Sequence, residues 1–233
     1  PYLFQQWGPT LSIIAGVCWF GLLFFAGITS SLAMGTPWMG FMRDEFGWSK
    51  NKGAWSFGAM ILVLGLPTVI FFQEGVFDEY DYWAGTVSLV VFAMLETILF
   101  SWVFGMDKGW REIISGADIK VPNIYKFIIK YVTPIMLIII FLGSLLKPID
   151  NDWSGNVSSL LSGNGWTLDN GSIIKTVMHA GIKNQIALAT DPVIIEQLQD
   201  KIVYLNFARL LLVGLFVFIS TLVYVAFLKR RRE

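Results

Sequence analysis

The apolar run from Leu11 to Met42 constrains the fold of this chain more than any other feature. As an α-helix it is roughly 45 to 50 Å long, whereas the hydrocarbon core of a bilayer is only about 30 Å thick. Such a helix crosses a membrane with length to spare. The run therefore predicts a transmembrane helix, which we place at about residues 9–42.

Composition shows that the rest of the chain has the same character. Of its 233 residues, 55% are hydrophobic and only 15% are charged, which is far from the balance of a soluble domain. The formal net charge is zero, so nothing favours a nucleic-acid partner. Cys18 is the single cysteine, which excludes an internal disulfide and a cysteine-rich metal site. These features indicate a polytopic membrane protein in a lipid bilayer.

Five apolar segments are long enough to span a membrane. Four of them lie within residues 1–147, at about 9–42, 53–72, 83–104 and 122–146. The fifth, followed by a basic cytoplasmic tail, lies within 201–233. A short cytoplasmic helix is expected at 107–115, with an apolar side that can lie at the membrane surface. The predicted fold class is an all-α membrane protein with five transmembrane helices.

Residues 148–200 form a polar insert between the fourth and fifth spans. Four apolar residues of the insert are spaced as one helical face and predict a helix at about 171–189; they are Ile174, Val177, Met178 and Ile182. His179 lies in this helix. No second His, Cys or carboxylate is spaced with it for metal or acid-base chemistry, so a surface or capping role is expected.

The placement of lysine and arginine predicts the orientation, because cytoplasmic loops carry an excess of both. With the C-terminus in the cytoplasm, twelve of the 17 basic residues lie inside: Arg43, Lys50, Lys52, Lys108, Arg111, Lys120, Lys126, Lys130, Lys229, Arg230, Arg231 and Arg232. The insert and the acidic loop at 73–82 then lie outside. We expect a multi-pass protein of the cell (inner) membrane.

Two sets of residues in the spans are functional candidates. Ala26, Thr29, Ser30 and Ala33 recur at helical spacing, which gives the first span a small and hydroxylated face. This face serves either close helix packing or the binding of something through its oxygens. Glu96 lies at mid-depth in the third span, either as a functional acid or as a protonated carboxyl bonded to a neighbouring helix.

Four blocks in order carry a resemblance to a known family: Phe24–Ser31, Asp44-Glu45, Phe77–Thr86 and Gly105–Trp110. They closely resemble the C-terminal part, about helices 8 to 12, of bacterial neurotransmitter:sodium symporters. The resemblance covers nearly the whole chain except about 148–200. It implies that the five spans form part of an inverted-repeat bundle, with the N-terminal helices supplied by a longer parent chain.

The resemblance also implies a sodium site and part of a substrate pocket. The Ala26 carbonyl and the hydroxyls of Thr29 and Ser30 match sodium ligands of the family. Ser30 and Met34 match positions that line its substrate pocket. A hard cation of this size takes about five or six oxygens, so the remaining ligands are expected from the upstream helices.

Two acids match the gates of the family. Asp44 resembles the acid of the cytoplasmic gate, and Asp81 resembles that of the extracellular gate. In the family, the partners of both acids lie on the missing N-terminal helices. Standing alone, either residue would be read as an acid at a helix end.

The predicted function is that of a C-terminal fragment of a sodium-coupled secondary transporter for amino acids or related small amines, working by alternating access. Sodium is the expected ion, with no organic cofactor. No catalytic constellation is present in the sequence, so an enzyme is not expected. The alternative is a non-transporting membrane subunit or truncated product that packs against a partner. Whether the protein forms a homodimer is left open.

Overall fold

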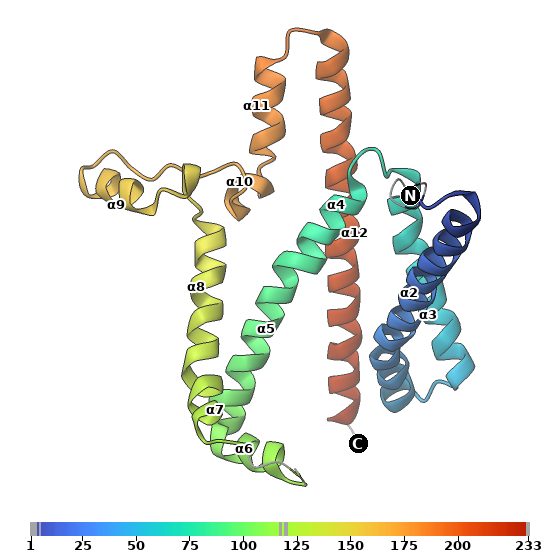
Figure 1. The fold of residues 1–233 in the computed structure, drawn as a ribbon. Helices are drawn as coiled ribbons and strands as arrows, with labels where there is room; N and C mark the ends of the chain where they lie inside the picture. Colours follow the sequence, from blue (N-terminus) through green and yellow to red (C-terminus); the bar gives the residue numbers. More distant parts are fainter. Residues whose placement is uncertain (1–3, 5, 117, 119–120, 232–233) are drawn as a thin grey trace. The chain divides into compact units, whose positions relative to one another are not determined.

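The computed structural model describes residues 4, 6–116, 118 and 121–231. The described residues contain five helices that are long and apolar enough to cross a membrane: Pro9–Phe46, Lys50–Ile70, Val76–Ile114, Ile124–Leu145 and Pro192–Arg230. The predicted all-α membrane fold with five long apolar helices is confirmed (Figure 1). Lys120 and Arg232, which contributed to the predicted orientation, lie outside the described residues.

The chain forms two compact units. One contains the described residues up to Pro67 together with those from Phe216 onward, and the other contains Thr68–Leu215. The last helix, α12 (Pro192–Arg230), contributes to both.

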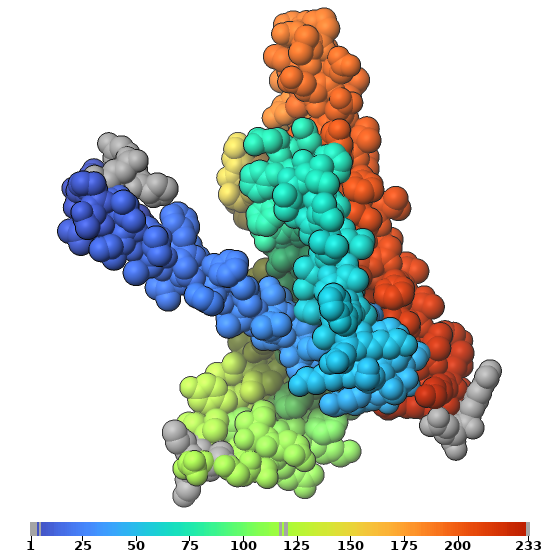
Figure 2. Space-filling view, turned by 90° about the vertical axis from the view of Figure 1, so that its right-hand side faces the viewer, coloured from blue at the N-terminus to red at the C-terminus, as the bar shows by residue number. Residues whose placement is uncertain are grey.

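The first unit is built on helices α2 (Pro9–Phe46) and α3 (Lys50–Ile70). Gly47 ends α2 in the left-handed conformation, with φ 67°, which lets the chain reverse into α3. A Cβ atom at Gly35 would lie 2.4 Å from Cε1 of Phe57, so the two helices make their close contact there. The Trp38 indole donates to Ser56 Oγ at 3.0 Å. Figure 2 shows the N-terminal half of α2, in dark blue, standing away from α3.

The second unit begins with a helix that is longer than the sequence predicted. The loop expected at 73–82 is instead a short turn followed by α4 (Val76–Tyr80), because Gly75, with φ 80°, turns the chain early. Asp78 and Glu79 in the first turn favour a helix start through the helix dipole. The helix continues through η1 (Asp81–Val87), α5 (Ser88–Ile98) and η2 (Leu99–Gly105).

Gly105 turns the chain again, with φ 95°, into the short helix α6 (Met106–Ile114). The fourth span consists of α7 (Ile124–Phe127), η3 (Ile128–Val132) and α8 (Thr133–Leu145). α5 packs against α8. Between η2 and η3, the Trp102 indole donates to the Lys130 carbonyl at 2.7 Å.

The insert contains four short helices: η4 (Ile149–Asn151), α9 (Trp153–Leu161), α10 (Ile173–Val177) and α11 (Ala180–Leu188). The prediction of a single helix at 171–189 is wrong. His179 has φ 53° and ψ 33°, a left-handed conformation through which a right-handed helix cannot continue. The chain therefore changes direction between α10 and α11.

Candidate functional site

The expected sodium ligands lie in the middle of α2. Thr29 Oγ1 lies 2.9 Å from the Phe25 carbonyl oxygen and 3.1 Å from that of Ala26, and its proton is shared between them. The Ala26 carbonyl and the Thr29 hydroxyl are therefore neighbours. Because a hydroxyl carries one proton and two lone pairs, Thr29 keeps acceptor capacity for a cation.

The side chains around this pair are uncovered. Thr29 and Ser30 are exposed, and Met34, one turn beyond Ser30, is 76% exposed. Among the described residues of the first unit, α3 packs against a different face of α2. The hydroxylated face is therefore free to meet another helix or an ion.

The face of α2 toward α3 lines a wide groove of about 500 Å³. Gly27 and Ser31 lie in it, with apolar residues of both helices around them. Ser31 Oγ donates to the Gly27 carbonyl at 2.8 Å. Thr29 and Ser31 thus make similar bonds to their own helix while they point to different surroundings.

The expected cytoplasmic gate acid, Asp44, is held by its neighbour. Arg43 Nε lies 3.0 Å from Asp44 Oδ1, and both side chains are mostly exposed. The next acid, Glu45, binds the basic end of α12: Arg230 donates to both of its carboxylate oxygens, and Lys229 Nζ donates to its carbonyl at 3.1 Å. Sequence reasoning used these basic residues only to orient the chain and missed this contact.

The expected extracellular gate acid, Asp81, is the first residue of η1 and is exposed. Its carboxylate lies along the helix, over Gly85: a Cβ atom at Gly85 would be only 2.9 Å from Asp81 Oδ1. A small residue at position 85 therefore leaves room for the acid.

Glu96, predicted as a possible buried acid, is exposed on α5 in the described part of the chain. The hydropathy pattern placed it at mid-depth in its span, and α8, which packs against α5, leaves it uncovered. Among the described residues of the second unit, the acid that is buried is Glu79, which is 8% exposed.

Glu79 belongs to a polar network that the sequence did not reveal. Arg209 Nε of α12 donates to Glu79 Oε1 at 2.5 Å, and the Trp83 indole donates to the same oxygen at 2.6 Å. The Arg209 guanidinium also lies over the Trp83 ring, 5.3 Å from its centre. A buried carboxylate is thus matched by a cation and a second donor.

Of the two roles expected for His179, the capping position is the one observed: it is the N-cap residue of α11, although its side chain makes no cap bond. A surface position is wrong, because the residue is only 8% exposed. Its Nε2 lies 2.9 Å from Asn206 Oδ1, and its Nδ1 lies 3.4 Å from Arg209 Nη2. The left-handed break between α10 and α11 turns its ring toward α12. The signal that could have found the network is the polar pair Asn206 and Arg209, three residues apart in an otherwise apolar stretch.

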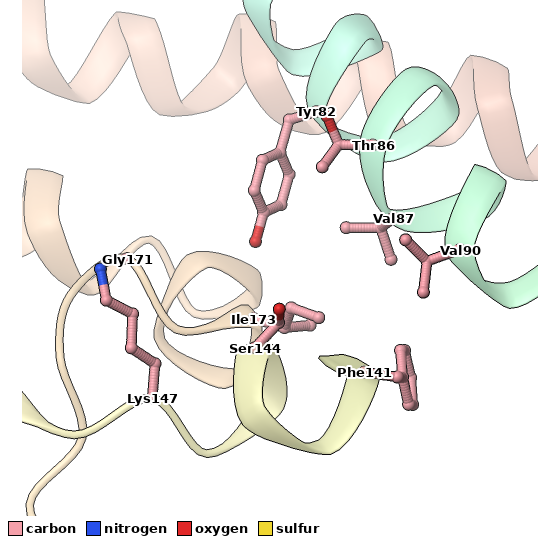
Figure 3. Close-up of a pocket in the computed structure, with 9 residues that line it drawn as sticks. All are labelled: Tyr82, Thr86, Val87, Val90, Phe141, Ser144, Lys147, Gly171 and Ile173. Carbon is pink, nitrogen blue, oxygen red and sulfur yellow. The ribbon is translucent and has the colours of Figure 1, made fainter. Parts of the chain in front are cut away.

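A small pocket of about 140 Å³ lies between η1, α5, α8 with Lys147 after it, and the start of α10 (Figure 3). Its polar lining comes from Tyr82, Thr86, Ser144 and Lys147. Lys147 Nζ lies 3.4 Å from Asp169 Oδ1. A backbone N–H bond from Gly171, and to a smaller extent Lys147, hold the pKa of Asp169 below its ordinary value.

Comparisons with known proteins point to one group. The sodium:neurotransmitter symporter family matches residues 8–184. An uncharacterized sodium-dependent transporter of Methanocaldococcus jannaschii is 30% identical over 135 residues, which cover 55% of this chain and 26% of that protein. The sodium-dependent nutrient amino acid transporter 1 of Drosophila melanogaster is 27% identical over 136 residues, or 57% of this chain and 21% of that protein. The chain thus spans about a quarter or a fifth of these relatives.

Proposed function

Because the chain belongs to the sodium:neurotransmitter symporter family, we propose that it forms the C-terminal five-helix part of a sodium-coupled symporter. The observation that carries this proposal is the pairing of the Ala26 carbonyl with the Thr29 hydroxyl, 3.1 Å apart on an uncovered face of α2. Two oxygens at this separation can share one hard cation.

The proposed sodium site consists of the Ala26 carbonyl and the hydroxyls of Thr29 and Ser30. Sodium prefers oxygen ligands and takes about five or six of them. Three oxygens from one helix therefore form an open half-shell, which a second helix of a larger bundle would complete. The exposure of Thr29 and Ser30 supports this arrangement, because it leaves their oxygens accessible.

The substrate we propose is an amino acid or a related small amine. The Drosophila relatives are named as nutrient amino acid transporters. Ser30 and Met34 lie one turn apart beside the proposed ion site, so a substrate that contacts them would lie close to the sodium. This proximity would couple the two binding events.

Alternating access requires gates on both sides of the substrate. We propose Asp44 for the cytoplasmic gate and Asp81 for the extracellular gate, each exposed and thus able to meet a cationic partner. Arg43 already pairs with Asp44, so a cytoplasmic partner would compete with this local bond. The excess of basic residues supports a cytoplasmic C-terminus in the inner membrane.

A non-transporting subunit that packs against a partner is the second candidate. It would account for the many large apolar side chains that the described residues leave exposed, such as Trp55 and Val69, at 81% and 77%. Lipid and further helices of a transporter would cover the same side chains, so this observation fits both candidates.

Uptake in proteoliposomes distinguishes the two candidates. We expect a sodium gradient to drive uptake of at least one amino acid by a transporter that contains this sequence as its C-terminal part. The isolated 233 residues should not transport, since they supply only half of the proposed ion shell. Uptake that is indifferent to sodium, or absent for every amino acid and small amine, would support the subunit instead.

A further inference from the structure

We propose that Arg209 is a positioning residue for the extracellular gate: it fixes the rotation of the helix that carries Asp81. The proposal rests on the proposed role of Asp81, but the contacts that support it are independent of that role. They join three segments of the second unit, namely α4 with η1, the end of α10, and α12.

Arg209 is an unusual residue for its position. It lies in a long apolar helix, and its side chain is only 18% exposed. A guanidinium so placed is costly unless its donors are bonded. The hydrogen bonds of the Arg209 guanidinium therefore indicate which segments the residue keeps in place.

One side of the guanidinium holds the helix that carries Asp81, formed by α4 and η1 and called the gate helix below. Nε donates to Glu79 Oε1, and the guanidinium lies over the ring of Trp83, whose indole donates to the same oxygen. Glu79 and Trp83 are one helical turn apart and so share one face. Two anchors on one face prevent the helix from turning about its axis.

Asp81 lies between the two anchors in sequence. Two residues of helix rotate a side chain by roughly 200°, so Asp81 points to the side opposite Glu79. While Arg209 holds Glu79 and Trp83 against α12, the carboxylate of Asp81 is directed away from α12. The observed exposure of Asp81 and burial of Glu79 agree with this geometry.

The other side of the guanidinium holds the insert. Nη1 donates to the Val177 carbonyl at 2.7 Å, and Nη2 donates to the Thr176 carbonyl at 2.9 Å. Both carbonyls lie at the end of α10, where the helix dipole favours a cation, and the Thr176 carbonyl also accepts from the His179 N–H at 3.1 Å. Arg209 thereby links the insert to the gate helix.

His179 adds a further contact to Arg209. We call Arg209 and the residues that bind it, Glu79, Trp83, Thr176, Val177 and His179, the clamp. A guanidinium only donates hydrogen bonds, so the Nδ1 atom beside it must accept, and the ring proton is inferred to be on Nε2, which donates to Asn206 Oδ1. The ring thus bridges Asn206 and Arg209. It keeps the guanidinium turned toward Glu79.

The experiment follows the gate helix by thiol modification. In the symporter that contains this sequence, Cys18 is replaced by Ser and Ala84, which is exposed one turn after Asp81, is replaced by Cys. The rate of modification by a membrane-impermeant reagent is measured for Arg209→Gln, Arg209→Lys and Glu79→Gln, per folded molecule. Lys201→Gln is the matched control, because Lys201 is a basic residue of α12 near Gly75 but outside the clamp.

We expect Arg209→Gln and Glu79→Gln to change the modification rate about tenfold, since the loss of a hydrogen bond to a charged group shifts an equilibrium by roughly that factor. Arg209→Lys keeps the charge without the planar fork and should restore part of the native rate. Lys201→Gln should leave the rate unchanged.

Native rates in folded Arg209→Gln and Glu79→Gln proteins would overturn the proposal, and so would an equal change in Lys201→Gln. If Arg209→Gln does not fold, Arg209→Lys and Glu79→Gln decide. The thiol-modification rate is measured independently of transport. A protein that shows the expected modification rates but no sodium-driven uptake would therefore refute the proposed function and support the role of Arg209. A protein that transports, with native modification rates in all variants, would support the proposed function and refute the role of Arg209.

Discussion

The replacement of Thr29 by alanine tests the proposed sodium site most directly, because α2 supplies its own control. Thr29 and Ser31 both donate to a carbonyl of the preceding turn, at 2.9 and 2.8 Å. Each alanine variant therefore loses a similar bond within the helix. The two differ in that Thr29 lies beside the Ala26 carbonyl on the open face, whereas Ser31 lines the groove toward α3.

If the Thr29 hydroxyl ligates sodium, its removal leaves the ion under-coordinated. The loss of such a contact to a charged group is worth about 1.5 to 3 kcal/mol. At about 1.4 kcal/mol per factor of ten, sodium binding should weaken roughly 10- to 150-fold. A hydroxyl that serves only helix packing is worth about 0.6 kcal/mol within a membrane, and its loss has no particular link to sodium.

The assay is a sodium titration of substrate binding in the proposed symporter, for the Thr29→Ala, Ser30→Ala and Ser31→Ala variants. We expect a large loss of sodium affinity in the first two and little change in the third. Thr29→Ser, which keeps the oxygen, should retain most of the affinity. Equal sodium affinities in all three alanine variants would refute the assignment of the site to this helix.

Two further predictions concern stability. Gly35→Ala places a methyl group 2.4 Å from the Phe57 ring and should destabilise the α2–α3 pair by about 1 to 3 kcal/mol, whereas Gly40→Ala, with open space around it, should be neutral or stabilising. Thermal unfolding in detergent checks both, and a stable Gly35→Ala protein would contradict the close contact. The bond from the Gly171 N–H and the Lys147 charge lower the pKa of Asp169 from its ordinary value of 3.8, so their stabilisation of the insert is present above that pH and is lost as the pH falls through the lowered value. Protection from hydrogen exchange near residues 147–172, relative to the intrinsic rate at each pH, should therefore fall below about pH 4 in the native protein more than in Asp169→Asn, and identical profiles would show that the bond contributes nothing.

The sequence by itself determined the fold class and the five spans. Apolar runs as long as the one from Leu11 to Met42 have no other stable conformation in a bilayer, since the backbone must satisfy its own hydrogen bonds there. At the start of α12, Asp191 Oδ1 accepts from the Val193 N–H at 2.9 Å, and expectations for local features of this kind come from the sequence. These features depend on neighbouring residues, which a linear pattern records.

The sequence also contains, in the same order as in the family, the blocks that carry the resemblance, and the family match agrees with this resemblance. For the site on α2, it could show that Ala26, Thr29 and Ser30 share a helical face. The distance between the Ala26 carbonyl and the Thr29 hydroxyl came from the structure, because the spacing of residues along the sequence does not determine the rotamer of Thr29.

Only the tertiary structure decided which polar groups are buried. Hydropathy singled out Glu96, yet among the described residues it is Glu79 that is buried, where Arg209, 130 residues further along the chain, reaches it through the packing of α12. His179 looked solitary in sequence for the same reason: its partners lie on another helix, and a left-handed residue turns its ring toward them. Contacts between distant segments depend on how helices pack, and no periodicity within a single segment contains that information.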